Sequence, residues 1–85
     1  MAEITRNGED FTVDAATIAE GLDLPEHAIA RAMSTGAITT RTERGEGPDE
    51  GRFRLSFFYR RQVLRLTVDS DGNLLSRARF ERSQN

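Results

Sequence analysis

The chain has 85 residues, of which 31% are charged and 36% are hydrophobic, and its net charge at pH 7 is −2. This length and composition predict one folded domain with a modest core, and they exclude a disordered chain. The absence of cysteine excludes disulfide bonds, zinc–thiolate sites and thiol nucleophiles.

The N-terminal segment predicts a small β-hairpin. Asn7-Gly8 is a typical hairpin turn, because both residue types tolerate a positive φ. It joins a short strand around Ile4 to a second strand over Phe11–Val13.

Residues 14–36 predict two short helices. Asp14 is suited to an N-cap position, and apolar side chains follow it at helical spacing as far as Leu22. Gly21 is the expected C′ residue of this helix. Pro25 fits the first turn of a second helix, which ends at Gly36.

From residue 38 onward the pattern alternates with a period of two and predicts a four-stranded antiparallel meander. A polar, glycine-rich loop over residues 44–51 separates the first strand from the other three. Turns at Arg60-Arg61 and at Ser70–Gly72 set the register of those three strands. The predicted pairs are Phe53 with Val68, Leu55 with Leu66, Phe57 with Leu64 and Tyr59 with Gln62 across the first turn, and Val68 with Leu74, Leu66 with Ser76 and Leu64 with Ala78 across the second.

This register gathers the apolar residues on one face of the sheet. It predicts an α+β fold in which both helices pack on that face. The expected core consists of Phe11, Val13, Ile18, Leu22, Ile29, Met33, Ile38, Phe53, Leu55, Phe57, Leu64, Leu66, Val68, Leu74 and Phe80. The single domain is expected to span residues 1–82, followed by a frayed tail at residues 83–85.

The opposite face of the sheet is predicted to be rich in arginine. Residues 36–85 carry a net charge of +3 and residues 1–35 a net charge of −5, and every basic residue is an arginine. The predicted face comprises Arg52, Arg54, Ser56, Phe58, Val63, Arg65, Thr67, Asp69, Leu75, Arg77 and Arg79, with Arg41 from the first strand of the meander. In this register Arg52 faces Asp69, which suits an ion pair. Arg65 faces Arg77, a like-charge pair that an acid, salt or a bound anion would have to offset.

Three interpretations of this face stay open. It is a solvated surface whose arginines pair with nearby acids. Alternatively, it is a surface for a protein partner or for self-association, because Phe58, Val63 and Leu75 are apolar. The third interpretation is a surface for an anion or for single-stranded nucleic acid. The candidate binding residues are Arg54, Phe58, Arg65, Arg77 and Arg79.

The sequence contains no recognisable catalytic or metal-binding constellation. Residues 69–73 begin like a calcium loop, but the sixth position is Leu74 and the twelfth is Phe80, so the segment is interpreted as a hairpin turn. The glycine-rich loop at 44–51 has neither a following helix nor a lysine to hold phosphate. His27 is the single histidine and has no acid–base partner near it in sequence. We therefore expect no enzymatic activity, no cofactor and no metal.

Residues 14–36 also have the outline of a DNA-binding helix-turn-helix, which is a second alternative. The charges of this segment argue against it, because Glu20, Asp23 and Glu26 would repel phosphate. The simpler interpretation is a pair of helices that cover the core.

Four segments of the chain carry a family resemblance: Phe11–Ala15, Gly36–Arg41, Gly51–Phe58 and Leu64–Leu66. In their order and spacing they resemble a family of small bacterial proteins that is classed as a domain of unknown function. The resemblance covers nearly the whole chain and implies no activity, cofactor or site residues.

The leading hypothesis is a small non-catalytic interaction module that uses the outer sheet face for a protein partner or for self-association. Its first residues, Met1–Arg6, are polar and are not followed by an apolar run. No signal peptide or membrane span is predicted, so a cytoplasmic location is the default expectation.

Overall fold

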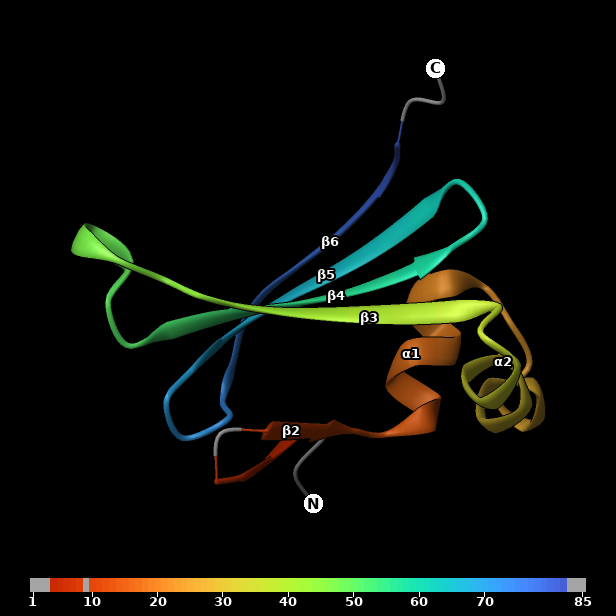
Figure 1. Cartoon of the computed structure of the whole chain (residues 1–85), viewed down its shortest axis with the longest axis horizontal. Coiled ribbons are helices and arrows are strands. Elements are labelled where there is room, and N and C mark those ends of the chain that lie inside the picture. The colour runs from red at the N-terminus through yellow and green to blue at the C-terminus, as the bar shows by residue number, and fades with distance from the viewer. Residues whose placement is uncertain (1–3, 9, 83–85) are drawn as a thin grey trace.

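The chain forms two layers, which are seen side by side in Figure 1. A computed structural model describes residues 4–8 and 10–82, so the predicted frayed tail at 83–85 lies outside the described residues. One layer is a sheet of β3 (Ile38–Arg44), β4 (Arg52–Tyr59), β5 (Gln62–Asp69) and β6 (Leu74–Glu81). The other layer holds the hairpin strands β1 (Ile4–Asn7) and β2 (Asp10–Val13) and the helices α1 (Ala15–Leu22) and α2 (Ile29–Thr35). The predicted α+β class, with its hairpin, two helices and four-stranded antiparallel sheet, is confirmed.

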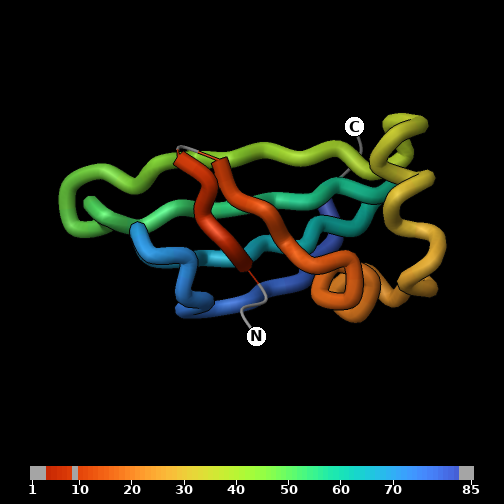
Figure 2. Tube along the Cα trace, turned by 90° about the horizontal axis from the view of Figure 1, so that it is seen from below, coloured from red at the N-terminus to blue at the C-terminus, as the bar shows by residue number. Residues whose placement is uncertain are grey.

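The sheet is a meander whose strands lie in chain order, which places β3 and β6 at its two edges. The tight turn at Arg60 and Arg61 gives the predicted pairing of β4 with β5, including Phe57 opposite Leu64. Arg60 adopts a positive φ of 55° in this turn. The hairpin crosses the sheet at an angle, and the helices lie beside one end of it (Figure 2).

Helix α1 begins after Asp14 and ends at Leu22, as the spacing of apolar residues predicts. The details of its two ends differ from the prediction. The Asp14 carboxylate makes no capping hydrogen bond, and the left-handed residue that follows the helix is Asp23, with a φ of 58°. Aspartate tolerates this conformation better than most residues. Gly21 is therefore not the C′ residue and lies inside the helix.

The second predicted helix is divided into two short pieces. Pro25 precedes a 3₁₀ turn over Glu26–Ala28, and α2 then continues to Thr35. Gly36 ends α2 with a φ of 82°, a conformation that glycine adopts without steric cost. The glycine-rich loop between β3 and β4 likewise contains a 3₁₀ turn over Gly47–Asp49.

The core lies between the two layers. The buried residues that contact one another are Ile4, Ile18, Ala19, Leu22, Ile29, Ile38, Phe53, Leu55, Phe57, Leu64, Leu66 and Val68. Phe11 and Val13 are half-buried against this cluster. Three assignments to the predicted core are wrong, because Met33 is 40% exposed and Leu74 and Phe80 are each 38% exposed. Met33 borders an open groove, and Phe80 lies on the other face of the sheet.

Helix α1 lies close to β5 because Gly21 has no side chain. A Cβ atom at this position would lie 2.6 Å from the Cδ1 atom of Leu64, which is completely buried. The Leu64 side chain would have to shift to admit the added atom, and overpacking of this kind destabilises a core. Gly21 therefore allows the helix to pack closely on the sheet. Leu22, the next residue, is only 1% exposed, which agrees with this close packing.

We expect Gly21→Val to lower the free energy of unfolding by about 1–3 kcal/mol, because the new side chain would overpack the contact with Leu64. Ala16→Val is the matched control, since Ala16 lies on the exposed side of the same helix and the change adds only a small propensity cost. Urea unfolding followed by circular dichroism measures both. Equal losses for the two variants would show that Gly21 has no packing role.

Candidate interaction surface on the outer sheet face

The pairing of β5 with β6 contains a β-bulge that the sequence pattern does not reveal. Val68 faces Leu74 as predicted, but the next pair is Thr67 with Ser76, which leaves Leu75 without a partner. Side chains alternate along a strand with a period of two. One extra residue therefore turns the remainder of β6 over, so that side chains predicted on one face lie on the other.

Beyond the bulge, the predicted pairs and the predicted face assignments are wrong. The observed pairs are Leu66 with Arg77, Arg65 with Ala78, Leu64 with Arg79 and Val63 with Phe80. Arg65 consequently faces a small side chain. The like-charge pair with Arg77, and the need for an anion to offset it, do not arise.

The bulge carries Arg77 and Arg79 to the helix side of the sheet. The Arg77 guanidinium lies 3.8 Å from the carboxylate of Glu20 in α1. Arg79 donates a hydrogen bond of 3.4 Å from its Nη1 to the carbonyl oxygen of Gly21 in the same helix. The five predicted binding residues are thus divided between two faces, and these two arginines help to hold α1 against the edge strand.

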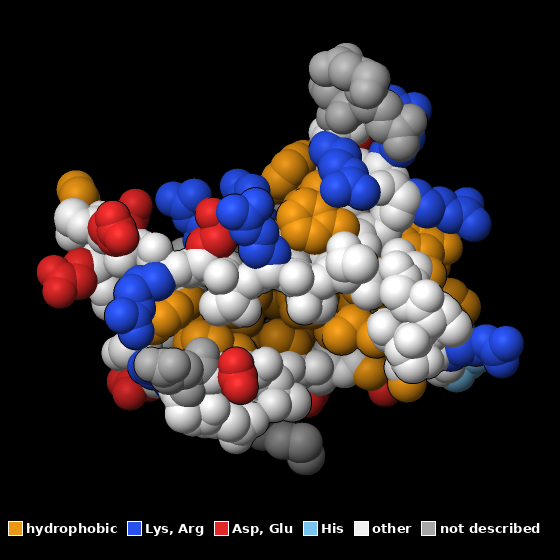
Figure 3. Space-filling model, viewed as in Figure 1, with side chains coloured by type: hydrophobic (Ala, Val, Ile, Leu, Met, Phe, Trp, Pro, Cys, Tyr) orange, Lys and Arg blue, Asp and Glu red, His pale blue; other side chains and the backbone are white. Residues whose placement is uncertain are grey.

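Three of the predicted binding residues, Arg54, Phe58 and Arg65, share the face that is turned away from the helices. Phe80 joins them from β6 because the bulge places it there. Leu75 does not join the outer face as predicted, because it is the unpaired residue of the bulge. Its side chain is 48% exposed. Figure 3 shows arginine side chains gathered around exposed apolar groups above the sheet.

The centre of this face is a row of three apolar side chains that crosses three strands. Phe58 of β4 pairs with Val63 of β5, and Val63 pairs with Phe80 of β6. Val63 is only 1% exposed although none of the described helices covers it. Its burial follows from the two larger rings that flank it. We call Phe58, Val63 and Phe80 the apolar row.

Each ring of the apolar row lies against an arginine. The guanidinium carbon of Arg82 is 5.1 Å from the centroid of the Phe58 ring, and that of Arg65 is 5.0 Å from the centroid of the Phe80 ring. Contacts of this kind contribute about 0.5–1 kcal/mol each at exposed sites. Arg82 is also fixed by a hydrogen bond of 3.0 Å from its Nη2 to the Arg60 carbonyl oxygen.

Two polar atoms beneath this face lack hydrogen-bond partners among the described residues. They are the Nε of Arg65 and the Oγ of Ser56, and both are buried. The two residues are paired across β4 and β5. A buried donor or acceptor without a partner costs free energy, so this part of the sheet is less well satisfied than the rest.

The positive charge of the outer face is concentrated at one end. At the end near the β3–β4 loop, Asp49 lies 3.7 Å from Arg54 and 3.9 Å from Arg52. The ion pair of Arg52 is therefore with Asp49, although Arg52 lies opposite Asp69 as predicted. Arg65 and Arg82 make no ion pair within residues 4–8 and 10–82. Their positive charges therefore lie beside the apolar row without an acidic partner in the described part of the chain.

The comparison with protein families agrees with the resemblance drawn from the sequence. The profile of the family of unknown function DUF6522 matches residues 1–85. The chain belongs to this family. No curated protein and no solved structure shows significant similarity to this DUF6522 chain. The family description assigns no function, so the functional argument rests on the geometry of this chain.

Other candidate chemistry in this DUF6522 chain is sparse. His27 is exposed in the 3₁₀ turn before α2. Among the described residues, no three His, Asp or Glu side chains are grouped so that they could hold a metal ion. The helices within that same part of the chain are too short or too polar to cross a membrane.

Sequence reasoning missed two residues of this surface, Phe80 and Arg82. The alternation of apolar residues continues smoothly through β6 and therefore predicts Phe80 in the core. The available signal for an irregular strand pairing is the turn between β5 and β6. Its first residue, Asp69, is of a type whose side chain can accept a hydrogen bond from the backbone N–H two residues later. Arg82 follows the last residue of β6 and is the last residue of the predicted domain, where no pairing pattern in the sequence assigns it to a face.

The turn before the bulge is organised by Asp69. Its carboxylate accepts hydrogen bonds of 2.9 Å from the backbone N–H groups of Asn73 and Asp71, and one of 3.1 Å from the Asn73 side-chain amide. These bonds, the backbone N–H of Asn73 foremost, lower the pKa of Asp69 below its usual value. The carboxylate therefore stabilises the folded turn while it is ionised.

We expect Asp69→Asn to lower stability near neutral pH, and we expect the deficit to shrink as the pH falls. A depressed folded-state pKa gives stability that is complete above the unfolded pKa of about 3.9 and is lost as the pH falls through the folded value. Urea midpoints of the wild type and the variant, measured from about pH 6 to about pH 2.5, test this. Asp71→Asn is the charge-matched control in the same turn. A pH-independent deficit for Asp69→Asn would contradict the prediction.

Proposed function

We propose that this chain is a non-catalytic interaction module whose outer sheet face binds an acidic surface of a protein partner. The observation that carries the proposal is the apolar row of Phe58, Val63 and Phe80 bordered by Arg65 and Arg82. Apolar centres with aromatic and arginine residues are typical of protein interfaces.

The energetic basis of the proposal is burial of the rings together with pairing of the cations. Phe80 is 38% exposed, so a partner would remove apolar surface from water. The guanidinium groups of Arg65 and Arg82 are already held against the rings, which lowers the entropy lost when they bind an acceptor. A partner carboxylate at Arg65 would meet a side chain that makes no ion pair among the described residues.

Charge favours an acidic partner over a second copy of the chain. The turn between β4 and β5 adds Arg60 and Arg61 to the end of the sheet at which Arg82 lies. Two copies packed through this face would bring these cations together, and like charges brought together at an interface oppose association. An acidic protein surface would instead be steered to it.

An anion or single-stranded nucleic acid is the second candidate, and one observation favours it. Phe58 and Phe80 are aromatic side chains on a sheet face beside arginines, an arrangement that can stack bases. Two observations weaken it. Arg77 and Arg79 lie on the other face, and the ring contacts that bases would use are taken by guanidinium groups. The helix-turn-helix alternative gains no support, because Glu20 and Glu26 are exposed on the helical segment.

The double variant Arg65→Glu/Arg82→Glu tests the proposal. We expect it to weaken binding of a labelled twelve-residue peptide, in which leucines are flanked by glutamates, by about tenfold or more. Fluorescence anisotropy at low and physiological salt measures the affinity. Ala30→Glu/Arg31→Glu adds a comparable amount of negative charge at exposed positions of α2 and should bind the peptide as the wild type does, apart from a small uniform loss.

The same titrations with labelled oligouridine separate the two candidates. Salt-dependent binding of the RNA, lost in Arg65→Glu/Arg82→Glu and accompanied by no binding of the peptide, would replace the protein partner with single-stranded nucleic acid. No binding of either probe at low salt would contradict both candidates and leave the arginines as surface charge.

A further inference from the structure

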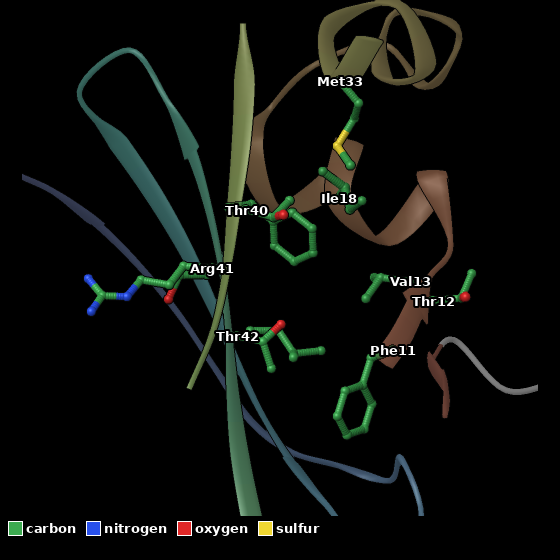
Figure 4. Close-up of a pocket in the computed structure, with 11 residues that line it drawn as sticks. Phe11, Thr12, Val13, Ile18, Met33, Thr40, Arg41 and Thr42 are labelled. Atoms are coloured by element: carbon green, nitrogen blue, oxygen red, sulfur yellow. The ribbon is translucent and has the colours of Figure 1, made fainter. Parts of the chain in front are cut away.

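An open apolar groove lies on the helix side of the sheet, across β3 and β4 from the outer face. Its volume is about 270 Å³, and its lining includes Phe11 and Val13 of β2, Ile18 of α1 and Met33 of α2. Figure 4 shows these four side chains directed into the cavity. In Figure 3 the groove is a hollow, apolar band between the sheet and the hairpin. The two layers of the fold are therefore not fully closed along this side.

The groove is bordered by an unpaired strand edge. Strand β3 pairs with β4 and has no strand on its other side among the described residues. Gly45, just after β3, donates its N–H to the Arg52 carbonyl across the ladder at 2.8 Å. Because hydrogen-bonded pairs alternate in an antiparallel ladder, the backbone groups of Thr40 and Thr42 point to the free edge. Such an edge can pair with another chain.

The free edge and the groove share the same residues. The side chains of Thr40 and Thr42 point into the cavity, whereas Arg41 between them points to the opposite face (Figure 4). Both threonines are exposed although they lie on the core side of the sheet, because the groove that they line is open. A strand added along β3 would place alternate side chains over the groove.

We propose that an extended segment of another protein adds to the sheet along β3 and places apolar side chains in this groove. Strand addition of this kind takes its affinity from main-chain hydrogen bonds and its specificity from pockets for alternate side chains. Arg41 defines one further feature of the segment. It is exposed, lies opposite the uncharged Ser56 and makes no ion pair among the described residues. The occupant therefore carries a carboxylate between two apolar residues, opposite Arg41.

A second copy of the chain fits this edge less well. The turn end of the β1–β2 hairpin lies over β3 in Figure 2, so two copies joined along β3 would bring their hairpin ends together. Strand β2 begins there with the exposed Asp10, so like charges would meet. The β3 of a second copy would also offer threonines, and not large apolar side chains, to the groove.

The test uses defined peptides and the full chain. The probe is a fluorescein-labelled eight-residue peptide in which valine alternates with threonine, with one central glutamate in place of a threonine. A matched peptide has lysine in place of the glutamate. We expect saturable binding of the glutamate peptide in fluorescence anisotropy, about two- to fivefold tighter than that of the lysine peptide, and we expect Arg41→Glu to reverse this order.

Thr42→Pro tests whether the peptide adds to the edge. Proline removes an N–H that faces the free edge and leaves the hydrogen bonds to β4 in place, and proline is tolerated on edge strands. We expect at least about tenfold weaker peptide binding, with an unchanged circular dichroism spectrum. Met33→Lys places a charge at the groove without touching the edge and should weaken binding as well. Arg65→Glu/Arg82→Glu, on the outer face, should leave this binding unchanged.

Two results would overturn the proposal. One is the absence of saturable binding up to about 1 mM peptide. The other is a concentration-dependent dimer in sedimentation equilibrium that Thr42→Pro abolishes, which would make a second copy the occupant. Binding that Thr42→Pro weakens, together with reversal of the peptide preference by Arg41→Glu, would establish strand addition along β3. These outcomes do not depend on the acidic partner proposed for the outer face.

Discussion

The close contact between Gly21 and Leu64 is the constraint on which the rest of the structure depends. It brings α1 onto β5, the strand whose Leu64, Leu66 and Val68 are completely buried. A chain of this size can bury only a modest core, so the loss of one close contact between its two layers would be costly. The helix also carries Glu20 and the Gly21 carbonyl, which meet the arginines of β6. One glycine thus supports the core and the position of the edge strand.

The β-bulge opposite Val68 divides the chemistry of β6 between two faces. Without it, Arg77 and Arg79 would lie on the outer face, and Phe80 would be directed to the core. With it, the two arginines contact α1, and Phe80 extends the apolar row beside Val63. The bulge therefore makes the outer face less cationic and more apolar than the regular register would. This is the physical reason for preferring a protein partner to a nucleic acid as the ligand of that face.

The two candidate surfaces arise from the same incompleteness of a small fold. The second layer is a short hairpin and two short helices, which cover the sheet unevenly. On the helix side it leaves the groove beside Met33 and the free edge of β3. On the outer face residues 4–8 and 10–82 form no second layer, and the large side chains Phe58 and Phe80 flank Val63. Both surfaces are therefore places where apolar groups lack a covering element within the described part of the chain.

The amino-acid sequence by itself determined the element order, the β4–β5 register and most of the core. These follow from local signals: turn residues at Arg60-Arg61, a glycine in the first hairpin, and an apolar pattern that only one register satisfies. The predicted Asn7-Gly8 turn is wrong by one residue, because Asn7 is the last residue of β1 and pairs with Asp10. Tertiary structure alone decided the rest. The bulge adds one residue opposite Val68, and the alternation of β6 favours Phe80 on the core side, which is the reverse of the face on which the structure places it. Gly21 gives no sign in sequence that it faces Leu64, because that contact joins residues far apart in the chain. The groove likewise depends on how the hairpin crosses the sheet, which local propensity does not specify.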